Sequence, residues 1–184
     1  MSFSAVLDAN TLYPFSLRDT LLRLAELELY TPRWSERILE EMRRNLVERP
    51  ITEEQADRLA AAMRDAFEEA EVDTTEIDRL EPDMTNDPKD RHVLAAAVAS
   101  GSELIVTFNL DDFPAHACEP LGVAAIHPDD FLLDLHRLAP ESVRAALEQQ
   151  AADLNSPWPL DQLLHALEIA GVPRFAAAVH AAEL

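Results

Sequence analysis

The sequence predicts an α/β fold in which helices flank a parallel β-sheet and a helical extension follows. Up to residue 138, short apolar runs that are typical of buried strands alternate with longer stretches of helical periodicity. Strands separated by helices favour a parallel sheet, because each crossover returns the chain to the same end of the sheet. From residue 139 onward only helical stretches occur. We therefore expect a sheet-containing domain at residues 1–138 and a helical C-terminal extension at residues 139–184.

Residues 1–70 predict one clear strand and three helices. The strand is the continuous apolar run at residues 4–9, and residues 30–34 predict a brief strand or turn. The helices are expected at residues 16–29, 35–49 and 52–70. Capping residues mark where they begin, namely Ser16 with Asp19, Ser35, and Thr52 with Gln55, and Pro50 lies just past the second helix.

The next stretch supplies the remaining strands. Residues 71–86 are polar and acidic, which predicts a loop with at most one short turn. A helix is expected at residues 87–101, with Asp87 as its cap, Pro88 at its first position and Gly101 as its terminator. After it we expect strands at residues 103–108 and 122–126, a turn at residues 109–114 and a helix at residues 128–138. The extension predicts helices at residues 140–154, 159–171 and 172–184.

The charge of the chain restricts its partners. It holds 15 basic and 35 acidic residues, a net charge of −20, which argues against a nonspecific grip on nucleic acid or anionic membrane. Residues 10–49 are the exception, because seven arginines there balance seven acids. There is no apolar run long enough for a membrane span and no signal-peptide pattern, and Cys118 is the single cysteine. We therefore expect a protein of the reducing cytoplasm.

Several carboxylates are expected at one rim of the sheet. Asp8 ends the first strand, and Asp111 and Asp112 follow the strand at residues 103–108. Asp87 and Asp90 stand at the start of the preceding helix, which lies at the same end in the usual strand-to-helix layout. Because ligands bind outside the carboxyl ends of parallel strands, this rim is the expected site.

The helix at residues 35–49 offers one further acid. At about 100° per residue, Glu41 flanks the apolar stripe formed by Ile38, Met42 and Leu46, whereas Glu40 faces almost opposite it. Glu41 is therefore the better candidate to face the core rim. The choices between Glu40 and Glu41 and between Asp111 and Asp112 stay open at this stage.

Clustered carboxylates repel one another unless a cation lies between them. A set of ligands made only of Asp and Glu oxygens suits Mg²⁺ or Mn²⁺ rather than zinc. Such ions can activate a water and stabilise the leaving oxygen in phosphodiester cleavage. A bound cation would also reverse the local sign of the charge, so that an acidic protein could contact a nucleic acid.

Four segments carry a resemblance to a known family. The stretches VLDANTLYP, SERILEEMRRNL, DPKDRHVLAAAVASG and ELIVTFNLDDFP resemble, in order and spacing, the acidic motifs of PIN-domain ribonucleases of the VapC-type toxin branch. The resemblance covers roughly residues 1–135 and implies a PIN-like sheet. It implies catalytic and metal-binding roles for Asp8, Glu41, Asp90 and Asp112, with Asn10, Thr107 and Asn109 in support. It also implies Mg²⁺-dependent cleavage of RNA, with Mn²⁺ as a substitute, a homodimer, and inhibition by a cognate antitoxin protein.

Two other functions stay open from the residues alone. A phosphatase or hydrolase of the haloacid type would use Asp8 as its nucleophile and Lys89 as a helper, although Asn10 stands where that class usually has a second acid. A non-catalytic module would use its acidic surface to bind a basic protein.

Overall fold

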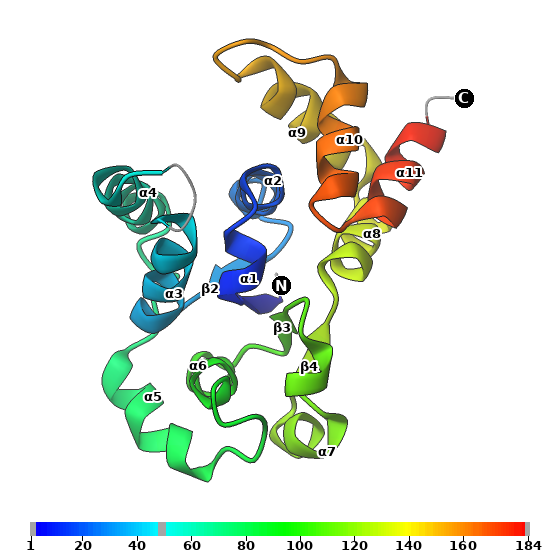
Figure 1. The fold of residues 1–184 in the computed structure, drawn as a ribbon. Helices are drawn as coiled ribbons and strands as arrows, with labels where there is room; N and C mark the ends of the chain where they lie inside the picture. Colours follow the sequence, from blue (N-terminus) through cyan, green and yellow to red (C-terminus); the bar gives the residue numbers. More distant parts are fainter. Residues whose placement is uncertain (1–2, 48–50, 183–184) are drawn as a thin grey trace.

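The computed structural model describes residues 3–47 and 51–182, and these residues form the predicted α/β fold (Figure 1). The strands are β1 (Ser4–Leu7), β2 (Thr31–Arg33), β3 (Leu104–Val106) and β4 (Ala124–Ile126). They make a parallel sheet of order β2-β1-β3-β4, so β1 is central and pairs with β2 on one side and β3 on the other. The segment at residues 30–34, predicted as a brief strand or turn, is an edge strand.

The β1–β3 register sets which residues emerge together at the carboxyl ends of these two strands. Val6 pairs with Ile105 and Leu7 with Val106, so both strands end at the same level. Asp8 and Thr107, the next residue on each strand, therefore emerge side by side. This register holds two groups close together that lie far apart in the sequence.

Helices cover the sheet along most of its length. Before β3 they are α1 (Ala9–Leu12), α2 (Phe15–Glu26), α3 (Glu36–Val47), α4 (Glu53–Ala66), α5 (Thr74–Leu80) and α6 (Arg91–Ser100). After β3 they are α7 (Ala115–Cys118), α8 (Pro128–Leu138), α9 (Pro140–Ala152), α10 (Leu160–Ile169) and α11 (Pro173–Ala181). Helix α6 contacts β1, β2 and β3, and α2 contacts β2. Short 3-10 turns lie at Glu81–Asp83, Leu110–Asp112 and Glu119–Leu121.

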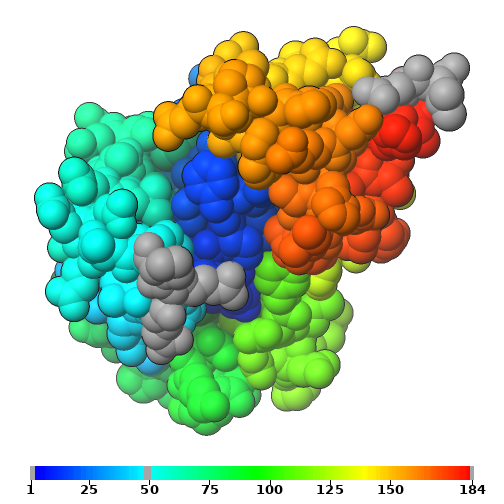
Figure 2. All heavy atoms as spheres, turned by 45° about the horizontal axis from the view of Figure 1, so that its top comes forward, coloured from blue at the N-terminus to red at the C-terminus, as the bar shows by residue number. Residues whose placement is uncertain are grey.

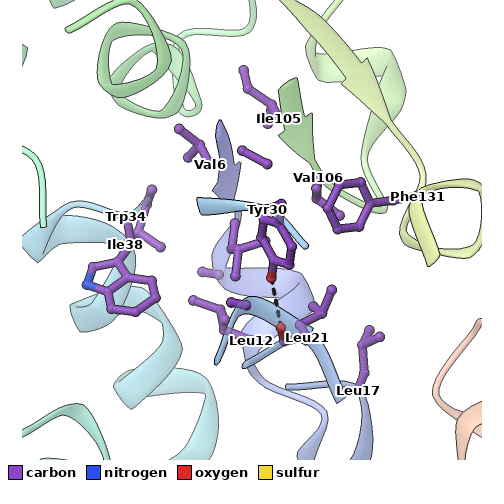
Figure 3. Packing of buried hydrophobic residues seen from close by; sticks show 14 of the residues in the cluster. Val6, Leu12, Leu17, Leu21, Tyr30, Trp34, Ile38, Ile105, Val106 and Phe131 are labelled. Atoms are coloured by element: carbon purple, nitrogen blue, oxygen red, sulfur yellow. Dashed lines mark hydrogen bonds between the residues drawn. The ribbon is translucent and has the colours of Figure 1, made fainter. Parts of the chain in front are cut away.

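The core beneath the sheet combines apolar packing with satisfied polar groups (Figure 3). Tyr30 and Phe131 are buried edge to face, with ring centroids 5.0 Å apart. The Tyr30 hydroxyl donates to the carbonyl oxygen of Leu21 at 3.0 Å, so burial of the ring leaves no phenol unpaired. Each buried Leu or Phe side chain contributes about 1.5–3 kcal/mol to folding.

The extension packs onto the sheet domain through two helices, α2 and α8 (Figure 1). Helices α9 and α10 contact α2, and α11 contacts α8. The buried side chain of Gln150 on α9 accepts a hydrogen bond from the Thr20 hydroxyl (2.8 Å) and donates to the carbonyl oxygen of Ser16 (3.0 Å). The helical character predicted for the extension is confirmed.

Three local predictions need correction. Residues 71–86, predicted as a loop, contain α5, because Asp73 accepts hydrogen bonds from the N–H groups of Thr75 and Glu76 and caps a helix there. Helix α2 begins after Pro14, and its start has no side-chain cap among the described residues, so the box predicted from Ser16 and Asp19 is wrong.

The third correction concerns the helix predicted from Asp87. Helix α6 begins at Arg91, and Asp87–Asp90 form a turn in which the Asp90 N–H donates to the carbonyl oxygen of Asp87 (3.0 Å). The caps predicted from Ser35 and from Thr52 with Gln55 are confirmed, and Gly101 ends α6 with φ +66°. Predictions that fall on residues 1–2, 48–50 and 183–184 lie outside the described residues. Within residues 3–47 and 51–182, no helix combines the length and apolarity that a membrane span requires.

Candidate active site

Asp8 lies buried at the carboxyl end of β1, where the ladder holds its backbone. Its N–H donates to the carbonyl oxygen of Val106 (3.1 Å), and its side chain is 4% exposed. Its Oδ2 accepts two hydrogen bonds of 2.7 Å, from Thr107 Oγ1 and from Asn10 Nδ2. The carboxylate is therefore oriented from two directions by uncharged donors.

The predicted supporting residues form one network around Asp8. Asn10 Nδ2 also lies 3.0 Å from Thr107 Oγ1, and Asn10 Oδ1 accepts from the N–H of Phe108 (3.2 Å). The N–H of Asn109 donates to Thr107 Oγ1 (3.0 Å). These bonds join α1 to the segment that follows β3, so the orientation of Asp8 depends on both chain segments.

Burial raises the pKa of Asp8, and the nearby Glu41 carboxylate raises it further. The hydrogen bonds from Thr107 and from the backbone of Ala9 act in the opposite direction, because they favour the ionised form. A buried carboxylate with a raised pKa is costly to ionise and is best stabilised by a cation.

A second group of carboxylates gathers beside it. Asp87, Asp90 and Asp112 each offer one oxygen, and these three oxygens lie within 4.8 Å of one another. The backbone enforces the contact, because the Asp87 N–H donates to the carbonyl oxygen of Asp112 (3.2 Å). All three side chains are partly exposed.

The surroundings of Asp90 also shift its pKa upward. Burial raises its pKa from an ordinary value of 3.8 to about 6, and the charges of Asp8, Asp112 and Asp87 add to the rise. Asp90 precedes α6, yet its side chain makes no capping hydrogen bond to the described part of the helix. Capping therefore does not account for an acid at this position.

Glu41 of α3 approaches from the opposite side. Its Oε1 lies 3.3 Å from Nε2 of the buried His92 and 3.5 Å from Nε of Arg37. Burial alone would raise its pKa, but the contact with His92 and the charges of His92, Arg37 and Arg44 outweigh burial and lower it. Glu41 is therefore anionic near neutral pH.

These residues line one cleft of about 390 Å³. Asp8, Glu41 and Asp90 contribute carboxylates, and Asn10 and Asn109 contribute amides. Arg44 and Lys89 also line the cleft, so it carries cationic side chains beside the acids. Asp112 joins the site through its contact with Asp87 and Asp90.

The structure separates the pairs that the sequence left open. Glu40 is exposed and pairs with Arg43, whereas Glu41 lines the cleft. Asp111 is exposed, whereas Asp112 belongs to the acidic cluster. Five of the seven residues named from the sequence line the cleft: Asp8, Asn10, Glu41, Asp90 and Asn109. Thr107 bonds to Asp8, and Asp112 lies in the acidic cluster with Asp90, whereas Asp8 and Glu41 stand outside that cluster.

Asp87 belongs to that cluster as well. From the sequence it was expected at the rim, while the resemblance gave the metal-binding role to Asp90; Asp87 was also expected to cap the following helix. The turn at residues 87–90 leaves Asp87 free of that role: its Oδ1 accepts from the Lys89 N–H (3.0 Å), and the helix starts later.

The donors present fit a hard divalent cation. They are carboxylate oxygens, which Mg²⁺ and Mn²⁺ prefer, and no His or Cys joins the cluster of described residues. Burial and the charges of Asp8, Asp112 and Asp87 raise the pKa of Asp90, so a cation bound there would favour its ionised form. Asp87, Asp90, Asp112 and the nearby Asp8 are the residues that would hold such an ion.

Comparison with known proteins gives two family matches and one curated relative. A family model described as "PIN domain" matches residues 4–111, and one described as "VapC50 C-terminal domain" matches residues 128–181. Over 95 residues the chain is 48% identical to a protein of Mycobacterium tuberculosis (strain ATCC 25618 / H37Rv) described as "Putative ribonuclease VapC50". That match covers 51% of this chain and 56% of the relative, so it spans a little more than half the relative's length. No solved structure matches.

Proposed function

Because the chain belongs to the PIN-domain family, we propose that it is a divalent-metal-dependent endoribonuclease and the toxin of a toxin–antitoxin pair. The proposed reaction is hydrolysis of an RNA phosphodiester bond. The curated relative, which matches about half of this chain, is described as a "Putative ribonuclease", and this supports RNA as the substrate. The second family match, at residues 128–181, supports a two-part description of the chain, with a nuclease domain at residues 1–138 and an extension at residues 139–184.

The observation that carries this proposal is the pairing of a buried acid with an acidic cluster at one cleft. Asp8 is 4% exposed, and it lies near enough to Asp90 for its charge to raise the pKa of Asp90. Structural stability alone would favour removing such a group of like charges. A site built to bind a cation and a phosphate explains why they are kept together.

Each residue has a distinct proposed role. Asp8, Asp87, Asp90 and Asp112 hold the cation, and the Asn10 and Thr107 donors keep the Asp8 carboxylate in one rotamer. Bound Mg²⁺, or Mn²⁺ in its place, would lower the pKa of water and stabilise negative charge on the phosphate oxygens. Glu41, whose pKa is lowered, stays ionised and would accept a hydrogen bond from the attacking water.

Arg44 and Lys89 complete the site on the substrate side. Both line the cleft, and Arg44 also lowers the pKa of Glu41. Cationic side chains at this position can contact the non-bridging oxygens of the RNA backbone. Arg44 lies in the part of the chain whose charge is least unfavourable to a polyanion, since residues 10–49 hold equal numbers of arginines and acids.

The proposed partners follow from the same site. An antitoxin would place a basic side chain over the carboxylates, because the cleft without a cation is strongly negative. A homodimer is also proposed, on the resemblance to VapC-type toxins. Purification of the native chain from its host should yield a complex with a small protein that has a basic tail; a chain that always purifies alone would argue for a stand-alone nuclease.

Cleavage assays with matched variants test the catalytic proposal. We expect Asp8→Asn, Asp90→Asn and Asp112→Asn each to slow Mg²⁺-dependent cleavage of a labelled RNA by on the order of 100-fold or more, since even outer residues of metal sites cost 10–100-fold. Asp111→Asn and Glu40→Gln are the controls, because these neighbours are exposed and do not line the cleft.

The same assay can contradict the proposal in two ways. Wild-type rates in all three variants would show that the mechanism does not need these carboxylates. Cleavage that continues in excess EDTA would show that it does not need a cation. A Glu41→Gln variant separates the roles further, because it should slow cleavage while leaving Mg²⁺ affinity largely unchanged.

A further inference from the structure

A second groove, of about 680 Å³, continues from the acidic cleft toward the C-terminal helices. The two share Asn10 and Asn45, so they form one continuous depression. Tyr13, Phe15 and Phe108 line the groove on the side of the nuclease domain, and Ile169 and its neighbours on α10 line the other. Figure 2 shows the N-terminal residues, in blue, set back between the cyan residues around α3 and α4 and the orange C-terminal helices.

The groove differs in chemistry from the rest of this acidic chain. Its lining in the described chain consists of uncharged side chains, although the protein as a whole carries a net charge of −20. Two large apolar side chains on its walls face solvent, with Phe15 55% and Ile169 76% exposed. Exposed apolar surface gathered in a concave region marks a binding surface.

The aromatic walls are held in place by contacts behind them. The Arg18 guanidinium lies 5.7 Å from the centroid of the Phe15 ring and donates to the carbonyl oxygen of Leu12 (2.7 Å). Arg18 is itself 6% exposed, so it is a fixed backing for an exposed ring. Phe15 thus has a cation over its ring while about half of the residue stays exposed to solvent.

The contact between the two sides of the groove is also specific. At Gly171, just past α10, the backbone has φ +99°, and a Cβ atom would stand 2.8 Å from Cε1 of Phe108. The glycine therefore lets the extension approach this ring. Phe108 directly follows Thr107, the donor to Asp8, so the groove begins beside the catalytic residues.

We propose that this groove binds an unpaired base of the RNA substrate, next to the phosphate that lies in the acidic cleft. The inference rests on the proposed ribonuclease function. Bases are flat and uncharged, and they stack on aromatic side chains whatever their sequence. An RNA whose phosphate reaches the cleft would carry its neighbouring nucleotide past Asn10 and Asn45, and the amide of Asn45 can bond to a base edge or a ribose hydroxyl.

This assignment defines the class of substrate. A base inside a duplex has both faces covered by its neighbours, so only a nucleotide in a loop, bulge or single strand can stack on Phe15. The helical extension then acts in substrate binding, because α10 supplies one wall. A protein segment could also enter an apolar groove, and the experiment below separates that occupant from RNA.

Binding of short RNAs to the full-length chain tests the proposal. The probes are fluorescein-labelled single strands of about ten nucleotides, one series with bases and one with abasic ribose-phosphate units, measured by anisotropy in Ca²⁺. We expect Phe15→Ala to weaken binding of the base-bearing strands by roughly 5- to 20-fold, the lower part of the range for loss of one stacked base. The abasic strands should bind wild type and Phe15→Ala equally.

Three further variants serve as controls and as a second probe of the groove. Phe15→Tyr keeps the ring and should bind like wild type. Leu138→Ala removes an apolar side chain that is also largely exposed (68%) but lies outside the groove, and it should have no effect. Ile169→Glu places a negative charge on the α10 wall and should weaken binding of both series; its exposure makes a folding defect unexpected.

Either of two results would overturn the proposal: equal affinity of wild type and Phe15→Ala for base-bearing RNA, or the same loss for base-bearing and abasic strands. A third result would also overturn it and assign the groove to a protein partner. In that case wild type binds no RNA, and a protein co-purifies with wild type but not with Phe15→Ala. Cleavage in Mg²⁺ is measured separately. If wild type cleaves RNA and Phe15→Ala binds RNA as wild type does, only the base site is rejected. If wild type does not cleave RNA, the proposed function is rejected.

Discussion

At the scale of single residues, the central fact is how a buried carboxylate is kept. Asp8 is placed by the backbone of β1 and oriented by Thr107 and Asn10, all of which are close to the cleft. Neither donor carries a charge, so neither neutralises the acid. The network therefore directs the carboxylate without removing its affinity for a cation.

The Thr107 hydroxyl offers a clean test of this orientation. We expect Thr107→Val, which keeps the shape of the side chain, to reduce RNA cleavage by about 10- to 100-fold through lost positioning of Asp8. Thr107→Ser retains the hydroxyl and should recover most of the activity. Circular dichroism should show unchanged folding in both; a fully active Thr107→Val variant would mean that Asn10 suffices.

Asp90 leads to a prediction about pH. An acid whose folded pKa is about 6, against an ordinary value of 3.8, binds more protons in the folded than in the unfolded chain between those two values. Its contribution to stability therefore falls as pH rises across that window and stays low above pH 6. Since the group is half-exposed, solvent screening limits the loss to about 1 kcal/mol or less.

Melting curves in EDTA measure this effect. From about pH 4 to pH 7, the Tm of wild type relative to Asp90→Asn should decline by no more than about 2–4 °C, which corresponds to ~1 kcal/mol in a chain of this size. Added Mg²⁺ at pH 7 should raise the Tm of wild type more than that of Asp90→Asn. A difference in Tm that does not change with pH would show that Asp90 is an ordinary surface acid.

At the scale of elements, short turns orient the three acids of the cluster toward one another. The prediction of a helix from Asp87 was wrong by one turn, and those residues instead fold back so that Asp87 and Asp90 meet Asp112. In a helix that began at Asp87, the two acids would instead stand about one turn apart on one helix face. The segment between α5 and α6 is therefore as important to the site as the strands.

The first turn of helix α11 is anchored to α8 by a buried acid, Asp129. Asp129 on α8 accepts hydrogen bonds from the N–H groups of Phe175 (2.8 Å) and Arg174 (3.2 Å), which are unsatisfied donors of the first turn of α11. Asp129→Ala should lower the free energy of unfolding by about 1–2 kcal/mol, as for loss of a helix cap.

The control is Asp130→Ala. Asp130 pairs with the exposed side chain of Arg174, so its loss should cost no more than about 0.5–1 kcal/mol. Urea unfolding of both variants gives the comparison. Equal losses would show that the anchoring of α11 does not depend on the buried acceptor.

At the scale of the whole molecule, the C-terminal helices α9–α11 and the sheet-containing part of the chain share one core. Gln150 of α9 bonds to Thr20 and Ser16 of α2, and buried side chains continue from the sheet into α9–α11. Although the sequence divides at residue 139, we expect the chain to unfold in a single transition, because neither side of this contact is solvated in the native state.

The two tryptophans make that expectation measurable. Trp34 lies in the nuclease domain and Trp158 in the extension, and the chain has no others. In Trp158→Phe and in Trp34→Phe, urea transitions followed by the remaining tryptophan should coincide with those followed by circular dichroism. Two separated transitions in either variant would show that the extension unfolds independently.

Much of this architecture could be read from local patterns. Continuous apolar runs predicted the strands, periodicity predicted the long helices, and Ser35, Thr52 and Gly101 predicted where three of them begin or end. Acids at strand ends predicted the rim, and the four-motif resemblance supported Asp8, Glu41, Asp90 and Asp112 as its members. The strands, the long helices and their caps depend on residues within one turn or strand, so the sequence alone determined them, whereas the roles of the four acids stay a prediction.

Tertiary structure decided what depends on pairing between distant segments. The 3.2 Å bond between Asp87 and Asp112 brought a third carboxylate into the cluster, and the β1–β3 register brought Thr107 to Asp8. The aromatic groove needed Phe15, Phe108 and α10 to meet, which the close approach at Gly171 permits. Each of these contacts joins residues far apart in the chain, and their free energy comes from packing that no local pattern records.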